Sequence, residues 1–302
     1  MKITTPFNKK FIEKFEIVLF EYLYYNTYNR FHIVPSFLEL RTTLSYLPVL
    51  SYTDIEYKDI ENIVKDTKDF KYIIKVLNPQ YKDFKKDDMV TMRVDISSHS
   101  FEEIMQNHIK ARTRNYIKQS QQENLIVKRG NDNSIINDFY KLYSHSMHKL
   151  GSPAHSIKMF QSFAKHFEDD VTFFICYKEN KPIYATSILY DENIAWSGWV
   201  GRDNSYSSSK AGYLLFAEAM KFASQEKKKD IFDFGRSGYQ SGTYSFKSKF
   251  GAIPVKIDIF SHINNRANLY SKYKLASAIW KYIPFKLADK LGNILVRYLP
   301  EY

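Results

Sequence analysis

The chain has 302 residues, which is long enough for two domains of roughly 100–150 residues each or for one large domain with additions. Apolar residues make up 44% and aromatic residues 17%, which excludes a disordered chain. A single cysteine excludes a disulfide framework and a multi-cysteine zinc site. The formal net charge of +11 favours a polyanionic partner: RNA, a nucleotide diphosphate or an anionic membrane surface. The same lysine and tyrosine usage is also what an AT-rich genome produces.

The N-terminal residues carry no apolar core of a signal peptide, because Glu13, Lys14 and Glu16 interrupt the first apolar run. No stretch approaches the roughly 18–20 uncharged apolar residues of a membrane-spanning helix. Cys176 stands in an apolar run and is expected to be a buried, inert core residue. We therefore expect a soluble, cytoplasmic protein, with a peripheral position at the inner face of the membrane left open.

The first hundred residues show a short, irregular alternation of helices and strands. Phe11, Phe15 and Leu19 recur at helical spacing, whereas Met89–Asp95 alternates apolar and polar residues as a half-buried strand does. The predicted elements are, in order, a helix over residues 8–30, strands over 37–46 and 47–52, a helix over 54–67, and strands over 71–78 and 89–95.

The next 160 residues are more regular. A Gly-Ser-Pro sequence at 151–153 marks the end of one long helix, and Ser97–Phe101 offers the start of another. The predicted order is helices over 101–122 and 134–150 with a strand over 125–129 between them, a helix over 156–166, strands over 171–178, 183–190 and 193–200, a helix over 212–227, and strands over 231–234 and 254–260.

This order predicts an α/β (α+β) fold, a mixed sheet flanked by helices. We expect an N-terminal domain over residues 1–100, a catalytic domain over 101–262 and a helical tail over 263–302. The tail places apolar residues such as Leu287 and Leu291 opposite lysines such as Lys290. A basic amphipathic helix of this kind either lies on an anionic bilayer or packs onto the domain.

The segment from Asp233 to Gly251 carries the clearest chemistry. It is rich in glycine and serine and is predicted to be a flexible loop at a strand end, where backbone N–H groups hold phosphate oxygens or an oxyanion. Arg236 suits a bidentate grip on a phosphate or carboxylate, and Lys247 supplies a compact positive charge. Ser237 and Ser241 of the same loop are candidate substrate-binding residues.

At this point the sequence resembles a known family. Asp-Phe-Gly-Arg-Ser at 233–237, Gly-Thr-Tyr-x-Phe-Lys at 242–247 and Phe-Gly-Ala-x-Pro at 250–254 are similar to the C-terminal signature of FemAB-related, GNAT-like proteins of envelope and exopolysaccharide systems. The resemblance covers about residues 90–258. It extends to upstream positions that we take as further candidate substrate-binding residues, namely Arg114, Asn115, Lys118, Gly151 and Trp196.

The resemblance implies tandem GNAT-like domains and an aminoacyl transfer to an amine of a peptidoglycan precursor. It also implies that Phe246 and Lys247 lie at the acyl-transfer site. A Lys247 ammonium would stabilise the negative charge that builds on the carbonyl oxygen. Asp233 or Tyr244 would take the proton of the attacking amine, unless the substrate itself is the base. Arg114 and Lys118, one helical turn apart, would clamp a diphosphate or a tRNA backbone.

Two departures bear on the donor. The glycine-rich loop with which acetyl-CoA enzymes of this fold bind pyrophosphate is replaced by Arg202–Gly212, which lacks that glycine pattern. The long coiled-coil arm of some Fem enzymes is missing too, because no heptad run occurs in the sequence. The missing glycine pattern favours aminoacyl-tRNA over acyl-CoA as the donor, whereas the missing arm weakens a direct tRNA interpretation, so acyl-CoA stays the alternative.

Three functions stay open at this stage. The first is an aminoacyl-tRNA-dependent transferase acting on a nucleotide- or lipid-linked envelope precursor. The second is an acyl-CoA-dependent N-acyltransferase acting on an amino sugar for a surface polysaccharide, and the third is a non-catalytic RNA- or membrane-binding module. His145 and His155 lack the spacing of metal ligands, so we expect neither a metal nor a bound cofactor.

Overall fold

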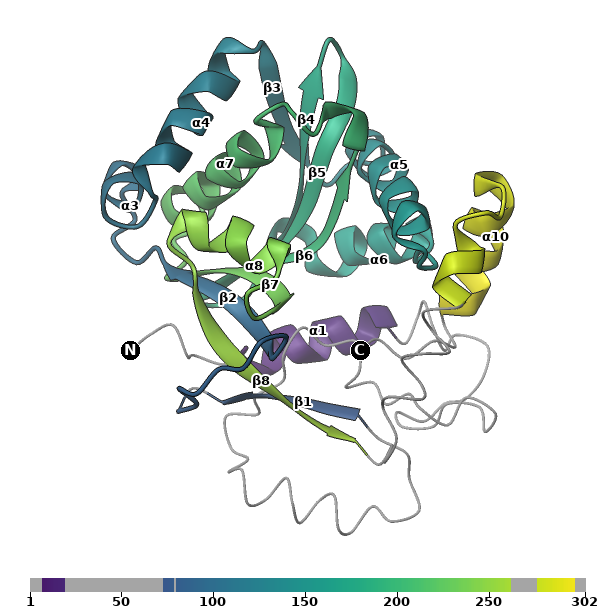
Figure 1. Ribbon diagram of the computed structural model, residues 1–302, viewed down its shortest axis with the longest axis horizontal. Helices are drawn as coiled ribbons and strands as arrows, with labels where there is room; N and C mark the ends of the chain where they lie inside the picture. The colour runs from purple at the N-terminus through teal and green to yellow at the C-terminus, as the bar shows by residue number, and fades with distance from the viewer. Residues whose placement is uncertain (1–6, 20–72, 79, 262–275, 297–302) are drawn as a thin grey trace.

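The computed structural model describes residues 7–19, 73–78, 80–261 and 276–296 (Figure 1). Its helices and strands are α1 (Lys9–Leu19), β1 (Ile73–Asn78), β2 (Met89–Asp95), α3 (Phe101–Asn107), α4 (Ala111–Gln122), β3 (Leu125–Gly130), α5 (Asn133–Leu150), α6 (Ile157–Phe167), β4 (Val171–Lys178), β5 (Lys181–Tyr190), β6 (Ile194–Arg202), α7 (Ala211–Gln225), β7 (Ile231–Gly238), α8 (Gly242–Lys247), β8 (Ile253–Ser261) and α10 (Phe285–Leu295).

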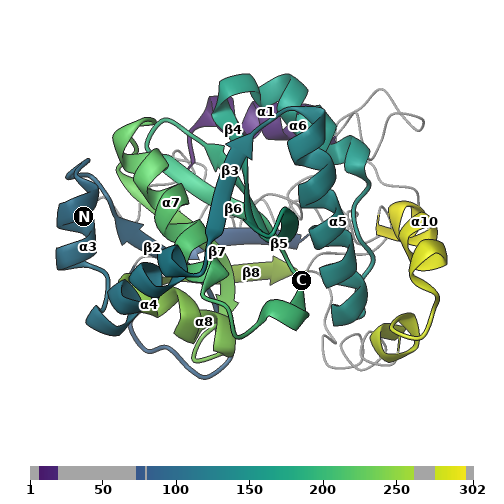
Figure 2. The same cartoon turned by 90° about the horizontal axis from the view of Figure 1, so that it is seen from above.

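All eight strands form one sheet in the order β1-β8-β2-β7-β6-β5-β4-β3. Every neighbouring pair is antiparallel except β6 and β7, which run parallel. One face packs against α5 and α6, with α1 lying on α6, and the other packs against α7, with α3 and α4 outside it (Figures 1 and 2). The fold is therefore the mixed sheet between helices that the sequence predicted.

Helix ends follow local signals in the sequence. Ser100, Asp132 and Ser156 each accept a hydrogen bond from a backbone N–H of the first turn of α3, α5 and α6. Gly151 ends α5 in the left-handed conformation at φ 79°, and a Cβ there would lie 2.3 Å from the carbonyl oxygen of Ser277. The absence of a Cβ at Gly151 thus lets the C-terminal segment approach the end of α5, and a role of Gly151 in substrate binding stays a prediction.

Two predicted elements differ from the structure. The helix expected over residues 101–122 is two helices, α3 and α4, separated by residues 108–110. The flexible loop expected after residue 234 is wrong, because β7 continues to Gly238 and α8 follows after three residues. Ser241 caps α8 by accepting a hydrogen bond from the backbone N–H of Tyr244. This N-cap stabilises a short helix in a sequence that is rich in glycine and serine.

The described part of the predicted N-terminal domain joins the same sheet as the rest. β2 lies between β7 and β8, and β1 pairs with β8. The strands expected at 37–46 and 47–52 and the helix expected at 54–67 lie outside the described residues. The tandem arrangement and the boundary at residue 100 therefore stay predictions.

Cys176 is fully buried, and burial raises the pKa of its thiol to about 12, so the thiol is unreactive at neutral pH. At the C-terminal end, α10 packs onto α5 and onto Ala154 through Ala288 and Gly292. Within the described ranges, no helix combines the length and the apolar character that crossing a bilayer requires.

Candidate functional site

The site begins where β6 and β7 separate. The two strands pair only from Ile194–Ile231 to Trp196–Asp233, although β6 runs to Arg202 and β7 to Gly238. Beyond that last pair, β6 and β7 no longer pair, whereas β7 stays paired with β2 up to Gly238, so only the carbonyl groups of β7 that β2 does not pair need other donors. The opening lies at the carboxyl ends of the two strands, where open sheets commonly hold ligands.

Lys247 supplies those donors. Its Nζ donates to the carbonyl oxygen of Gly235 at 2.9 Å and to that of Arg236 at 2.6 Å. Lys247 is the last residue of α8, and its side chain is half-buried between that helix and β7. The lysine is therefore fixed by the backbone next to the point at which the strands separate.

Burial away from water lowers the pKa of Lys247 to about 7. The negative charge of Asp233 opposes this shift, and the positive charge of Arg236 adds to it. A lysine with a pKa near neutrality exists in both the ammonium and the amine form at physiological pH, so it can accept and release a proton. This property is what an acyl transfer to an amine requires of an acid–base group.

Asp233 has a different environment. Its side chain is 1% exposed, and its two carboxylate oxygens accept hydrogen bonds from Thr91 Oγ1 at 2.5 Å, Arg93 Nε at 2.7 Å and the backbone N–H of Gly235 at 2.7 Å. Arg93 is itself fully buried and forms an ion pair with Asp233. A carboxylate held by three donors inside the sheet is a structural group, and this geometry argues against Asp233 as the general base.

The other candidates of the 233–251 segment lie around Lys247. Arg236 is half-buried and offers its carbonyl oxygen to Lys247, and Ser237 is buried with its hydroxyl on that same carbonyl oxygen. Tyr244 is half-buried, with its ring 5.0 Å from that of Tyr239. The structure thus brings Arg236, Ser237 and Tyr244 close to the strand opening.

Phe246, by contrast, faces the protein interior. Its ring lies 5.2 Å from that of Tyr213, 5.8 Å from that of Phe216 and 5.4 Å from that of Phe250. Phe246 thus anchors α8 to α7, which holds Lys247 at the opening.

The upstream candidates also include both exposed residues and residues engaged within the protein. Arg114 Nη1 donates to the carbonyl oxygens of Met105 and Ile109, so it stabilises the turn between α3 and α4. Its neighbours on α4, Asn115 and Lys118, are exposed. Nη1 of Arg114 is thus engaged within the protein, and the clamp of Arg114 with Lys118 stays a prediction.

Trp196 lies in the protein core. It is 7% exposed, and its ring packs against those of Phe7, Phe15 and Trp199, with centroids between 5.5 and 6.4 Å away. This aromatic cluster joins α1 to the last paired residues of β6. The tryptophan therefore supports the strands next to the opening, and its role in substrate binding stays a prediction.

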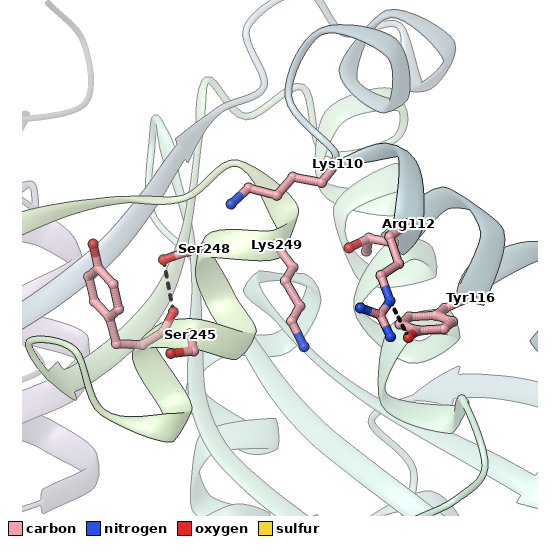
Figure 3. Close-up of a pocket in the computed structure, with 8 residues that line it drawn as sticks. Lys110, Arg112, Tyr116, Ser245, Ser248 and Lys249 are labelled. Carbon is pink, nitrogen blue, oxygen red and sulfur yellow. Dashed lines mark hydrogen bonds between the residues drawn. The ribbon is translucent and has the colours of Figure 1, made fainter.

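A groove of about 370 Å³ lies on the side of α8 that faces α4 (Figure 3). Figure 3 shows Lys110 and Lys249 reaching into the space between the two helices, and Arg112 directed at Tyr116. The lining residues are Lys110, Arg112, Thr113, Tyr116, Tyr244, Ser245, Ser248 and Lys249. No carboxylate is among them, so the groove favours an anionic ligand.

Aromatic rings and cations alternate along this groove. Arg112 Nε donates to the hydroxyl of Tyr116 at 2.6 Å, and Lys249 Nζ donates to that of Tyr213 at 3.1 Å. The Tyr116 and Tyr213 rings lie 5.0 Å apart, with Lys210 Nζ 5.0 Å from the centroid of the Tyr116 ring. Cations that bind phosphates beside rings that stack on bases are typical of a surface for single-stranded nucleic acid.

The segment that leads into α7 is less suited to a pyrophosphate. The backbone N–H groups of Ser207, Ser209 and Tyr213 donate to carbonyl oxygens of the same segment. That of Ala211 lies 3.5 Å from the hydroxyl of Ser209. A pyrophosphate site at a helix N-terminus needs free N–H groups, which these four residues do not offer.

Sequence reasoning missed most of the groove. Lys110, Arg112, Tyr116, Ser245, Ser248 and Lys249 were not among the candidates. The basic pattern of residues 110–118 was noticed in the sequence, but which of its members face α8 depends on how two helices 130 residues apart pack. Tyr213 and Lys249 are 36 residues apart in the sequence and come together only in the fold.

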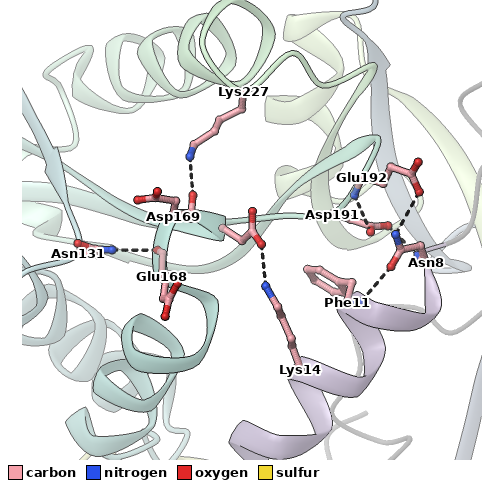
Figure 4. A network of polar contacts seen from close by, with 10 residues as sticks. Asn8, Phe11, Lys14, Asn131, Glu168, Asp169, Asp191, Glu192 and Lys227 are labelled. Atoms are coloured by element: carbon pink, nitrogen blue, oxygen red, sulfur yellow. Dashed lines mark hydrogen bonds and ion pairs between the residues drawn. The ribbon is translucent and has the colours of Figure 1, made fainter.

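A second polar network lies at another edge of the fold, around α1 (Figure 4). Lys14 pairs with Asp170 at 2.8 Å, and the backbone N–H of Asn8 donates to Asp191 Oδ2 at 2.7 Å. Lys227 Nζ donates to the carbonyl oxygen of Asp169. The first two contacts fasten α1 and the residue before it to the start of β4 and the end of β5. Over the described ranges, no cluster of histidine, cysteine and carboxylate side chains is suited to hold a metal ion.

Comparisons with known proteins agree with the predicted resemblance. Residues 105–248 match the family model described as an acetyltransferase (GNAT) domain. The crystal structure of FemX superposes with a TM-score of 0.52 over 71% of this chain and 77% of that one, at 13% identity. No curated protein sequence matches the chain.

Two further solved structures superpose equally well. The C-terminal domain of a putative lysylphosphatidylglycerol synthetase from Agrobacterium fabrum gives a TM-score of 0.51, covering 73% of this chain and 78% of that one at 10% identity. L-PGS from Bacillus licheniformis also gives 0.51, covering 74% and 77% at 12% identity. At such identities the likeness establishes the GNAT-like fold.

Proposed function

We propose that this chain, which carries a GNAT acetyltransferase domain over residues 105–248, is an acyltransferase that forms an amide on an amine of a cell-envelope precursor, with aminoacyl-tRNA as the donor. The observation that carries the proposal is Lys247, an amine with a pKa of about 7 held on two carbonyl oxygens where β6 and β7 separate. Two of the superposed structures are FemX and the C-terminal domain of a putative lysylphosphatidylglycerol synthetase, which supports an envelope substrate.

In the proposed reaction, the acceptor amine attacks the carbonyl carbon of the aminoacyl ester. A C–N bond forms, and neutral Lys247 takes the proton that the attacking nitrogen loses. The resulting Lys247 ammonium returns that proton to the leaving ribose oxygen as the C–O bond breaks. A pKa near 7 suits both steps, because neither proton transfer is then strongly uphill.

We assign the general base to Lys247 because Asp233, a candidate from the sequence, already accepts three hydrogen bonds. Asp233 is saturated with donors inside the sheet. Tyr244 lies on α8 with Lys247, where its hydroxyl is a candidate to position the acceptor. Once it has taken the proton, the Lys247 ammonium also stabilises the oxyanion of the tetrahedral intermediate.

The groove between α8 and α4 supports tRNA as the donor. Its cations suit the phosphates of an unpaired 3′ end, and the ring of Tyr116, which lines it, suits a base. α8 connects the two places, because Tyr244, Ser245 and Ser248 line the groove whereas Lys247 faces β7. The internally bonded N–H groups before α7 weigh against acyl-CoA, the alternative donor.

The test is a transfer assay with two donors and two acceptors. Purified protein is mixed with a pool of radiolabelled aminoacyl-tRNA or with labelled acetyl-CoA, and with a nucleotide-linked muramyl pentapeptide or a nucleotide-linked amino sugar. We expect amide formation from aminoacyl-tRNA only. Lys247→Met and Lys247→Arg should both lower the rate by about 10²–10⁴-fold, with unchanged circular dichroism.

Other outcomes decide among the alternatives. Transfer from acetyl-CoA to the amino sugar would replace the tRNA proposal with an N-acyltransferase of surface polysaccharide. Salt-resistant tRNA binding without transfer to any acceptor would indicate a non-catalytic RNA-binding module. Full activity of Lys247→Met would remove Lys247 from the reaction.

A further inference from the structure

The C-terminal residues 276–296 expose an unusual concentration of apolar side chains. Of the eleven large apolar side chains that are exposed in the described ranges, six belong to this short segment. Tyr282 is 89% exposed, Ile294 57% and Leu287 50%. We call the six residues the outer face: Ile279, Tyr282, Leu287, Leu291, Ile294 and Leu295.

The opposite side of the same segment is firmly packed. Ala288 and Gly292 lie against the protein, and a Cβ on Gly292 would be 3.1 Å from the backbone nitrogen of Ala154. Phe285 stacks on His145 at 3.7 Å between ring centroids, and the hydroxyl of Tyr140 donates to Asp289 at 2.8 Å. The segment is therefore docked on α5 through its inner side, and the outer face is what remains.

Charge on this segment is segregated in the same way. Asp289 is its one carboxylate, and it accepts the hydrogen bond from Tyr140 on the inner side. Lys281, Lys286 and Lys290 are exposed among the residues of the outer face. The outer face thus presents apolar groups and cations together, with no exposed acid.

Neighbouring residues of α5 extend the pattern. Leu150 is 66% exposed, Lys149 is exposed, and Ser277 Oγ donates to the carbonyl oxygen of Leu150 at 3.2 Å. Figure 1 shows α10 at the outer edge of the molecule, away from the sheet.

We infer that the outer face binds the surface of an anionic lipid bilayer. Leucine and isoleucine side chains would enter the boundary between headgroups and acyl chains, and lysines would meet the lipid phosphates. A tyrosine such as Tyr282 suits this boundary, because its ring is apolar and its hydroxyl is polar. The net charge of +11 favours the same partner. The inference stands apart from the proposed transfer, which needs only Lys247 and the groove.

Vesicle co-sedimentation of the full chain at about 0.15 M salt tests the inference. We expect binding to vesicles of phosphatidylcholine with phosphatidylglycerol and none to phosphatidylcholine alone. The pair Leu287→Asp and Leu291→Asp should lower the partition coefficient by about 100-fold. The triple Lys281→Glu, Lys286→Glu and Lys290→Glu should lower it by about 100-fold as well.

The matched control is the triple Lys158→Glu, Lys221→Glu and Lys228→Glu, which changes the net charge equally at exposed positions elsewhere. We expect it to alter partition less than about threefold. Equal losses in the two lysine triples would overturn the inference, since charge alone would then explain binding. The inference would also be overturned if the unaltered chain does not bind the vesicles, or if the leucine variant still binds them. It would be overturned as well if the unaltered chain is a dimer that the leucine variant cannot form and neither protein binds vesicles. Thermal unfolding confirms that each variant is folded.

Discussion

The charged side chains at the two halves of β7 have opposite surroundings. In its first half, Asp233 is buried and its charge is fully matched by Arg93, Thr91 and a backbone N–H group. Beside its second half, beyond the last pair with β6, the side chain of Lys247 from α8 donates only to carbonyl oxygens and has a pKa of about 7. A matched charge stabilises a fold, whereas an amine without a full counter-charge stays ready to exchange protons.

This difference separates two residues that the sequence placed in the same role. Asp233 and Lys247 were both candidates for the catalytic site, and they lie on the same strand and the helix that follows it. The point at which β6 and β7 separate lies between them. Asp233, paired with Arg93, lies where the sheet is continuous, and Lys247 lies where the two strands have separated. The predictions below test whether the two halves really differ in kind.

The largest effect is expected from Asp233→Asn. Loss of the carboxylate leaves Arg93 buried without its ion-pair partner, which should lower the free energy of unfolding by about 3–5 kcal/mol. Urea denaturation of the two proteins measures the difference. Asp258→Asn is the control, because Asp258 accepts a hydrogen bond from Asn78 in a partly buried position and should cost about 1 kcal/mol. Equal losses would mean that the first half of β7 is not specially stabilised.

A smaller effect is expected in the groove. Lys249→Glu should weaken binding of tRNA about tenfold and should lower the slope of log affinity against log salt by about one. Lys228→Glu, at an exposed position outside the lining, should change neither by a comparable amount. Affinity measured by filter binding over a range of salt concentrations gives both numbers. An unchanged slope in Lys249→Glu would show that the groove does not hold a phosphate.

Much of the fold could be predicted from the sequence because its signals are local. Ser156 and Gly151 set helix ends through contacts within a few residues. The strand at Met89–Asp95 was predicted with its bounds, although it was expected to be half-buried. Its five central residues are all buried, because β2 lies inside the sheet with helices on both faces.

The candidate site could be predicted only in part. Lys247 and Arg236 stand in a motif, so sequence resemblance alone found them. Arg93 is 140 residues from Asp233, and Lys249 is 36 residues from Tyr213. Pairs at such separations meet through strand order and helix packing, which no local pattern encodes. For the same reason Trp196 was predicted to bind substrate, although its partners in α1 make it a core residue.

The central claim is that neutral Lys247 takes the proton of the attacking amine. The most direct test is the pH dependence of single-turnover transfer from aminoacyl-tRNA, corrected for the neutral fraction of the acceptor amine. Since the amine form is active, the rate should rise about tenfold per pH unit below 7 and level off above it, with an apparent pKa of about 7. A rate that falls as pH rises through 7, and that Lys247→Arg restores, would contradict the claim and assign the ammonium form to the reaction.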